Sequence, residues 1–124
     1  MPERPNAFSK RERLRSKFDF ERLFARRCSV ADERLTLFGL FNSLPYSRAG
    51  FAVPRRFGSA VVRNRLKRRL REAYRLTKSA LPTGLDLILM PRTLTEPALD
   101  ELRGSLTRLA AQLEKKLRRQ EGDA

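Results

Sequence analysis

Basic side chains crowd one short part of this 124-residue chain, between residues 55 and 75. Nine of the 28 Lys and Arg residues fall within these 21 positions, against a single acid, Glu72. They are Arg55, Arg56, Arg63, Arg65, Lys67, Arg68, Arg69, Arg71 and Arg75. Like charges three or four positions apart on a helix repel each other, and one Glu cannot neutralise them all. The pattern is typical of a surface that a polyanion covers, and the alternative is an ordinary solvated helix face.

The composition of the whole chain favours the same kind of partner. The formal net charge is +14 and the pI is near 11.4, so the surface attracts polyanions such as nucleic acid or an anionic membrane. Arg supplies 22 of the basic residues and Lys only 6. Because guanidinium groups contact phosphates bidentately and stack on bases, this ratio favours nucleic acid. Genome base composition could explain the ratio, but it does not explain the charge.

Residue types that are missing exclude several kinds of catalytic site. The chain has no His, which rules out an imidazole base, a Ser-His-Asp triad and a His-ligated metal. The lone Cys28 cannot form an internal disulfide or a zinc knuckle, and it is most simply a small buried residue in a protein of the reducing cytosol. The acids show no metal-binding or acid–base spacing, although they leave a magnesium-dependent nuclease formally possible. The scattered acids include Glu21, Asp32, Glu33, Asp86, Asp100 and Glu101.

Five phenylalanines fall on the first helix and the first two strands that the sequence predicts: Phe20, Phe24, Phe38, Phe41 and Phe51. Aromatic side chains beside basic groups can stack single-stranded nucleic acid, at about 1–3 kcal/mol per base. Their commoner role is to fill a hydrophobic core, and spacing alone favours that role.

Hydrophobic spacing predicts the elements that position these side chains in the first half of the chain. A helix is expected over 17–26, where Phe20, Leu23 and Phe24 share one face. A strand over 34–41 and a return strand over 48–53 follow, the latter ended by Pro54 because proline has no N–H to donate. One further short strand is possible at 60–62.

The second half begins with the basic segment, which is expected to be a helix over 63–76. Its buried stripe is predicted to be Leu66, Leu70, Ala73 and Tyr74. A central strand is expected over 85–90. Thr95 can cap a last helix with Pro97 in its first turn.

The last helix carries a leucine repeat, formed by Leu99, Leu102, Leu106, Leu109 and Leu113. We expect it to pack on the sheet of the same chain, with a dimerisation seam as the alternative. The whole chain, 1–124, is expected to form one α+β or α/β domain, with residues 1–7 and 116–124 flexible. It has no apolar run long enough to span a membrane and no signal peptide, so we expect a soluble, cytoplasmic protein.

Residues 57–72 read FGSAVVRNRLKRRLRE, and this segment resembles the RNR signature of the bacterial ribonuclease P protein subunit. Three other segments are similar to that family in order and spacing, so the resemblance covers about residues 8–115. They are Asp19-Phe20-x-x-Leu23-Phe24, Gly50-Phe51-Ala52-Val53 and Gly84-x-Asp86-Leu87-Ile88. The chain departs from the family at Pro54-Arg55-Arg56, where charge is kept but the backbone donor at residue 54 is lost.

The resemblance implies a fold and a function. The fold is an α+β sandwich of two layers in the order α-β-β-β-α-β-α, with a left-handed βαβ crossover, like one domain of a ribosomal small-subunit protein. The function is that of the protein component of ribonuclease P, an endonuclease whose RNA subunit, with magnesium, removes the 5′ leader from precursor tRNA. The protein would be a monomer that binds and does not itself catalyse, with no catalytic residue and no firmly bound metal.

The resemblance also assigns roles to residues. The RNA-binding set would be Arg55, Arg56, Arg63, Asn64, Arg65, Lys67, Arg68 and Arg71. Phe20, Phe24 and Phe38 would line a cleft for the single-stranded leader, with Arg55 and Arg56 at its edge. Two alternatives stay open at this point: a structural or ribosomal RNA-binding protein without a role in cleavage, and a nuclease that acts without RNA.

Overall fold

The computed structural model describes residues 8–93 and 97–122 of the chain. Its elements are η1 (Lys10–Glu12), α1 (Lys17–Arg26), β1 (Ser29–Ala31), β2 (Leu35–Phe41), β3 (Arg48–Phe51), η2 (Arg55–Phe57), α2 (Ala60–Thr77), η3 (Lys78–Ala80), β4 (Leu85–Pro91) and α3 (Leu99–Gly122). The order of α-helices and strands is therefore α-β-β-β-α-β-α, as the family resemblance implies. The predicted flexibility of residues 1–7 and the predicted cap at Thr95 fall outside the described residues.

β4 lies inside a four-stranded sheet whose strand order is β1-β2-β4-β3. It pairs antiparallel with β2, where Phe38 faces Ile88, and parallel with β3, where Gly50 faces Ile88. The prediction that residues 48–53 return directly beside residues 34–41 is therefore wrong, because β4 separates the two strands. Residues 85–89 are all buried, and a strand that is apolar on both faces belongs inside a sheet and not at its edge.

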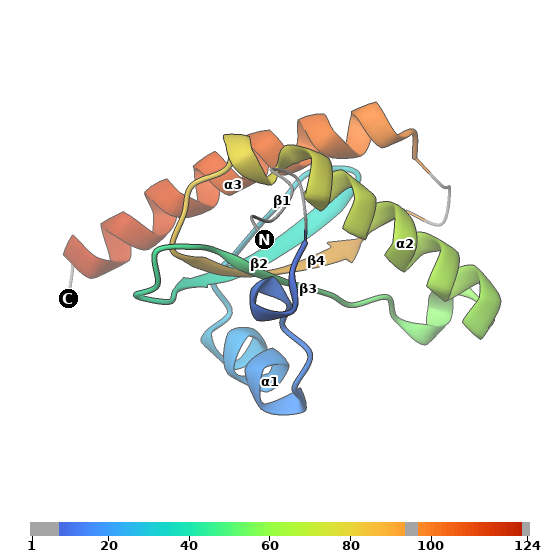
Figure 1. Ribbon diagram of the computed structural model, residues 1–124, viewed down its shortest axis with the longest axis horizontal. Coiled ribbons are helices and arrows are strands. Elements are labelled where there is room, and N and C mark those ends of the chain that lie inside the picture. The colour runs from blue at the N-terminus through green and yellow to red at the C-terminus, as the bar shows by residue number, and fades with distance from the viewer. Residues whose placement is uncertain (1–7, 94–96, 123–124) are drawn as a thin grey trace, which may run out of the picture.

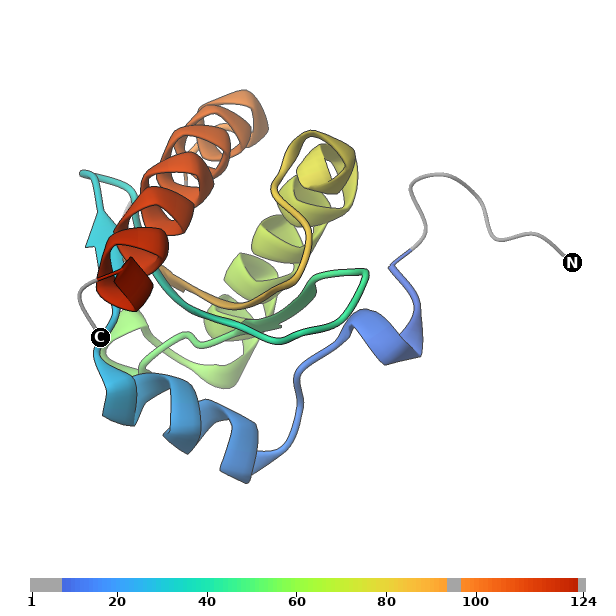
Figure 2. The ribbon, with the colours of Figure 1, turned by 90° about the vertical axis from the view of Figure 1, so that its left-hand side faces the viewer.

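α2 connects the parallel strands β3 and β4 across the face of the sheet that also carries α3 (Figures 1 and 2). With the helix in front and both strands pointing up, β4 lies to the left of β3, so the crossover is left-handed. Right-handed crossovers are the general rule for such units. This chain is thus an exception to that rule, and its left-handed crossover is the one that the family resemblance implies.

Helices cover the two faces of the sheet unequally (Figure 2). α2 and α3 pack against each other on one face and enclose the main core, which contains Leu37 and Leu87. α1 lies alone on the opposite face, over a smaller cluster that contains Leu23 and Ile88. The sheet and the α2–α3 pair therefore form the two main layers, and α1 covers the other face only in part, since Phe38 remains half-buried.

The leucine repeat of α3 packs on the sheet of the same chain, as predicted. Its buried members are Leu102, Leu106, Leu109 and Leu113. Leu99 is half-buried and packs against the same core. The repeat is therefore part of the fold of a single chain.

α3 begins later and ends later than predicted. It starts at Leu99, so Pro97 precedes the helix and does not lie in its first turn. It also remains helical to Gly122, although residues 116–124 were expected to be flexible. Leu117 is only 4% exposed, and the Lys116 ammonium donates a hydrogen bond to the Ser29 carbonyl at 2.7 Å. These two contacts hold the last turns of α3 on the domain.

Residues 60–62 form the first turn of α2 and not a strand. The Ser59 hydroxyl caps the helix by accepting a hydrogen bond from the Val62 N–H at 3.4 Å. Gly58 precedes the cap with φ of +125°, a backbone conformation that side chains disfavour. Glycine and serine at these two positions therefore turn the apolar triplet into a helix start.

Residues 8–16, which we call the N-terminal strap, lie along β3 and were not predicted to form any element. The Leu14 N–H donates to the Ala49 carbonyl at 2.9 Å, so the strap extends the hydrogen bonding of the sheet beyond β3. The Phe8 ring packs edge-on against Phe51 and Tyr74, with centroids 5.9 and 5.2 Å away. These contacts make the strap a fixed part of the domain.

An ion pair ties the strap to η3, at the C-terminal end of α2. Both oxygens of the Glu12 carboxylate accept hydrogen bonds from the Lys78 ammonium, at 2.8 and 3.0 Å. Burial alone would raise the pKa of Glu12, but the hydrogen bonds from Lys78 and Ser9 outweigh it and lower that pKa.

Candidate nucleic-acid interface

α2 presents one buried stripe and an exposed basic surface, as its sequence predicts. Leu66, Leu70, Ala73 and Tyr74 are buried and attach the helix to the core. The exposed residues include Asn64, Arg65, Arg68 and Arg71. The predicted stripe is thus confirmed, and the predicted RNA-binding residues of α2 lie beside it or opposite it.

Of the seven cations on α2, Arg63, Arg69 and Arg75 have a partner inside the protein. Arg75 donates to the Glu72 carboxylate, and the Arg63 Nε donates to the Gly58 carbonyl at 3.2 Å. Four cations form no hydrogen bond or ion pair with any residue in the described part of the chain: Arg65, Lys67, Arg68 and Arg71. Such side chains can bind phosphates without first breaking an internal contact.

These four cations border two different hollows, one on each flank of α2. A hollow of about 470 Å³ on the side of the strap is lined in part by Lys67 and Arg71. A second hollow, of about 300 Å³, includes Arg65, Arg68 and Leu99 in its lining and so lies toward the start of α3. The spacing of four residues between Lys67 and Arg71 puts both on the same flank.

Arg55 and Arg56 lie on η2, immediately before α2, and both are exposed. The Arg56 guanidinium lies over the ring of Phe57, 5.1 Å from its centroid. Phe57 is buried and anchors the short helix to the main core. The two arginines therefore extend the basic surface beyond the N-terminus of α2.

The structure brings Phe20, Phe24 and Phe38 together on the face of the sheet that carries α1. Phe20 and Phe24 meet edge-to-face with centroids 6.2 Å apart, and Phe24 and Phe38 with centroids 4.9 Å apart. All three rings are half-buried and pack against the cluster of Leu23 and Ile88. Of the three, Phe20 also lines the 470 Å³ hollow on the strap side of α2.

A buried carboxylate, that of Asp86, links the elements around these rings by hydrogen bonds. Asp86 of β4 is 0% exposed and accepts hydrogen bonds from three side chains. Arg22 of α1 donates at 2.6 Å, Arg48 of β3 at 2.7 and 2.8 Å, and Asn42 at 2.9 Å. The network therefore joins α1 to β3 and to the turn after β2.

The charge of Asp86 is stabilised by its neighbours. Burial alone would raise the pKa of its carboxyl group, but the hydrogen bonds from Arg48, Asn42 and Arg22 outweigh burial and lower that pKa. Asp86 is therefore ionised at neutral pH and holds two guanidinium groups beside α1.

Sequence reasoning missed two features of this interface. The first is the hydrogen-bond network around Asp86. The sequence signal for it was a single acid inside an otherwise apolar strand, because a buried carboxylate needs partners. The second feature is the pair of cations Arg15 and Lys17, which line the hollow on the strap side of α2. Nothing in their spacing indicates that they lie opposite Lys67 and Arg71.

Two further features bear on the class of site. Within residues 8–93 and 97–122, no group of three or more His, Cys, Asp or Glu side chains is placed to hold a metal ion. Among the same residues, no helix is both long and apolar enough to cross a membrane.

The sequence of this chain is similar to one family of known proteins. A family model described as Ribonuclease P matches residues 8–114. A relative named Ribonuclease P protein component, from Thermotoga petrophila, is 42% identical over 86 residues, which are 69% of this chain and 74% of the relative. A relative of the same name from Pelotomaculum thermopropionicum is 46% identical over 79 residues, or 64% of this chain and 70% of the relative.

Solved structures agree with the sequence comparison. The RNase P protein from Thermotoga maritima matches with a TM-score of 0.73 and 34% identity, covering 82% of this chain and 96% of that chain. The RNase P protein of Staphylococcus aureus matches with a TM-score of 0.67 and 26% identity, covering 79% and 91%. The similarity thus extends over nearly the whole length of these proteins.

Proposed function

This chain belongs to the ribonuclease P protein family, and from that premise we propose that it binds the catalytic RNA of ribonuclease P and the 5′ leader of precursor tRNA. In doing so it promotes the RNA-catalysed endonucleolytic removal of the leader, which gives the mature 5′ end of tRNA. The protein acts as a cytoplasmic monomer that assembles with one RNA.

The observation that carries the proposal is the set of unpaired cations on α2, Arg65, Lys67, Arg68 and Arg71. Each phosphate that such a side chain neutralises releases condensed counterions, which drives binding at low salt. With Arg63, Asn64 and the η2 arginines Arg55 and Arg56, they form the surface that we assign to RNA.

The phenylalanine cluster supports the second half of the proposal. Phe20, Phe24 and Phe38 are half-buried, so each keeps part of a ring available for a base. Stacking on aromatic rings tolerates any sequence, because every base has a π-face. This property suits a leader whose sequence differs from one precursor to the next.

In this proposal the RNA carries out the catalysis, and the RNA also binds the magnesium that it uses. The described residues offer no cluster of metal-binding side chains, and the Asp86 carboxylate is already surrounded by Arg22, Arg48 and Asn42. The protein contributes differential binding: it holds the precursor by its leader and screens crowded phosphates. Screening lowers the magnesium concentration at which the RNA is active.

Binding of precursor and mature tRNA to the reconstituted holoenzyme tests the proposal. We expect tighter binding of the precursor, and we expect the preference to disappear when the protein is omitted. Equal affinity for both tRNAs in the presence of the protein would contradict a role in leader recognition and favour a structural RNA-binding protein.

A further inference from the structure

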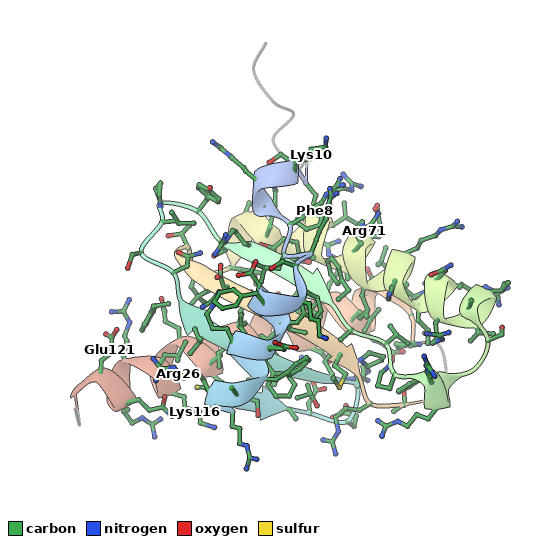
Figure 3. The ribbon with its side chains drawn as sticks, turned by 90° about the horizontal axis from the view of Figure 1, so that it is seen from below. Phe8, Lys10, Arg26, Arg71, Lys116 and Glu121 are labelled. Atoms are coloured by element: carbon green, nitrogen blue, oxygen red, sulfur yellow. The ribbon has the colours of Figure 1, made fainter. Side chains whose placement is uncertain are left out.

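The hollow between the N-terminal strap and α2, which we call the strap groove, collects cations from two distant parts of the chain. Arg15 and Lys17 reach it from the end of the strap and the start of α1, and Lys67 and Arg71 from α2. A neighbouring hollow of about 330 Å³ shares Arg15 and Arg71, which continues the groove toward Phe8. Figure 3 shows Phe8 and Arg71 on these two adjoining elements.

The cations of the strap groove are not neutralised by the protein. Arg15, Lys67 and Arg71 have no hydrogen-bond or ion-pair partner among residues 8–93 and 97–122. Lys17 has a single contact of this kind there, 3.8 Å from the exposed Glu21 carboxylate. Like charges that share one concave site raise its positive potential, and a bound polyanion removes this repulsion.

The floor of the strap groove is aromatic and its wall is rigid. Phe20 and Phe51 line it, and both are half-buried. The backbone that presents Arg15 is fixed one residue earlier, where the Leu14 N–H donates to the Ala49 carbonyl. A site whose walls are ordered before binding loses less entropy when a ligand is bound.

The lining and size of the groove suit a ribonucleotide with its phosphate. Its cations can bind the phosphate, its phenylalanines can contact the base, and its volume is about 470 Å³. We propose that the strap groove binds a phosphodiester of the catalytic RNA, which Arg15 and Arg71 contact together. The source is the catalytic RNA because Arg71 and Lys67 belong to the same α2 surface that we assign to it. This inference rests on the proposed function, and it extends the RNA-binding surface from α2 onto the N-terminal strap.

The test measures the affinity of the protein for the catalytic RNA over a series of salt concentrations. Arg15→Ala and Arg71→Ala should each weaken binding about tenfold. Each should also make the slope of log affinity against log salt shallower by about one unit, the effect of one lost phosphate contact. The double variant should lose less than the product of the two single losses, because both side chains contact one phosphodiester. Arg15→Lys keeps the charge and should retain most of the affinity.

Two control variants separate this inference from the proposed function. Arg119→Ala removes an exposed arginine near the C-terminal end of α3, the end that lies away from α2 (Figure 1), and should leave the affinity unchanged. If Arg15→Ala behaves like Arg119→Ala while Arg65→Ala weakens RNA binding, the inference fails and the proposed function stands. If Arg65→Ala also has no effect, the proposed function fails with it.

The leader is the other source of a phosphodiester. If Arg15→Ala leaves binding of the catalytic RNA unchanged but weakens binding of precursor tRNA to the holoenzyme, the assignment to the catalytic RNA is overturned. Arg15 is exposed and forms no hydrogen bond or ion pair in the described structure, so each result can be read with thermal unfolding unchanged as the folding control.

Discussion

At position 50, a missing side chain allows Phe20 to lie against the sheet. A Cβ atom on Gly50 would come within 2.7 Å of the Phe20 ring and 2.9 Å of the Leu14 carbonyl oxygen. Cβ atoms essentially never come that close to another heavy atom, so any other residue would displace the ring or the strap. Gly50 therefore sets the position of Phe20, which we place both in the leader cleft and on the floor of the strap groove.

Phe20→Ala should weaken the affinity of the holoenzyme for precursor tRNA and spare mature tRNA. Loss of one stacked base is worth about 1–3 kcal/mol, or about 5- to 150-fold. Binding of the two tRNAs, measured side by side, checks this prediction. Phe18→Ala is the matched control, since Phe18 lies on the same helix and is 72% exposed.

Truncation of a half-buried ring can also loosen α1. Phe20→Leu keeps apolar packing without a π-face, so it should bind precursor as weakly as Phe20→Ala while unfolding at nearly the wild-type temperature. Equal losses on precursor and mature tRNA would count against a leader cleft at Phe20.

Arg65→Ala should weaken assembly with the catalytic RNA and change its salt dependence. Arg65 is exposed and has no partner in the described chain, so its loss removes a phosphate contact without disturbing the fold. The slope of log affinity against log salt should become shallower by about one unit. An unchanged slope would show that Arg65 faces solvent in the complex.

Residue types and helical spacing predicted which side of α2 is buried, but not the partners of its other sides. Leu66 and Leu70 could be assigned to the core because their period is that of a helix. Whether Lys67 faces the strap or α3 depends on tertiary packing, which spacing does not contain. The same limit applies to Arg15, because Lys67 and Arg71, which line the same hollow, are more than fifty residues away in sequence.

At the scale of elements, Asp86 holds α1 and β3 in fixed positions. Its carboxylate contacts Arg22 of one element and Arg48 of the other, and both arginine side chains are about 30% exposed. α1 has few other strong polar ties to the sheet among the described residues, so the position of the phenylalanine cluster depends on this network.

Asp86→Asn should destabilise the protein by about 2–4 kcal/mol at neutral pH, because two guanidinium groups lose their counter-charge. A lowered pKa in the folded state stabilises the fold above the ordinary Asp value of about 3.9. That stabilisation is lost as the pH falls through the lowered pKa. Chemical unfolding of wild type and variant from pH 7 to pH 2 should therefore show a difference that shrinks in acid. A difference that stays constant over this range would contradict the role given to the Asp86 charge.

Most of the elements could be predicted from pattern, whereas the first strand and the pairing of the strands could not. Periodicity located α1 and most of β2, β4 and α2 within a few residues. β1 was missed because three residues, Ser29–Ala31, carry no alternating pattern. The insertion of β4 between β2 and β3 is a long-range effect, and local turn chemistry suggested a hairpin instead. The left-handed crossover could be expected only from the family resemblance.

At the scale of the whole molecule, the two proposed RNA sites are adjacent but distinct. α2 and the strap carry unpaired cations, and α1 and the sheet hold the aromatic cluster. Phe20 belongs to both, so a strand leaving the cleft can meet the basic surface without a break. The net charge of +14 then serves a binding role that spans both sites.

The most direct test is cleavage of a precursor tRNA with a 5′ leader by this protein and a bacterial ribonuclease P RNA at low magnesium. The three reactions contain protein alone, RNA alone, and both together. We predict cleavage at the mature 5′ end only when both are present, because the RNA is the catalyst and the protein supplies binding. Cleavage by the protein alone, or tight RNA binding that leaves the rate unchanged, would contradict this account.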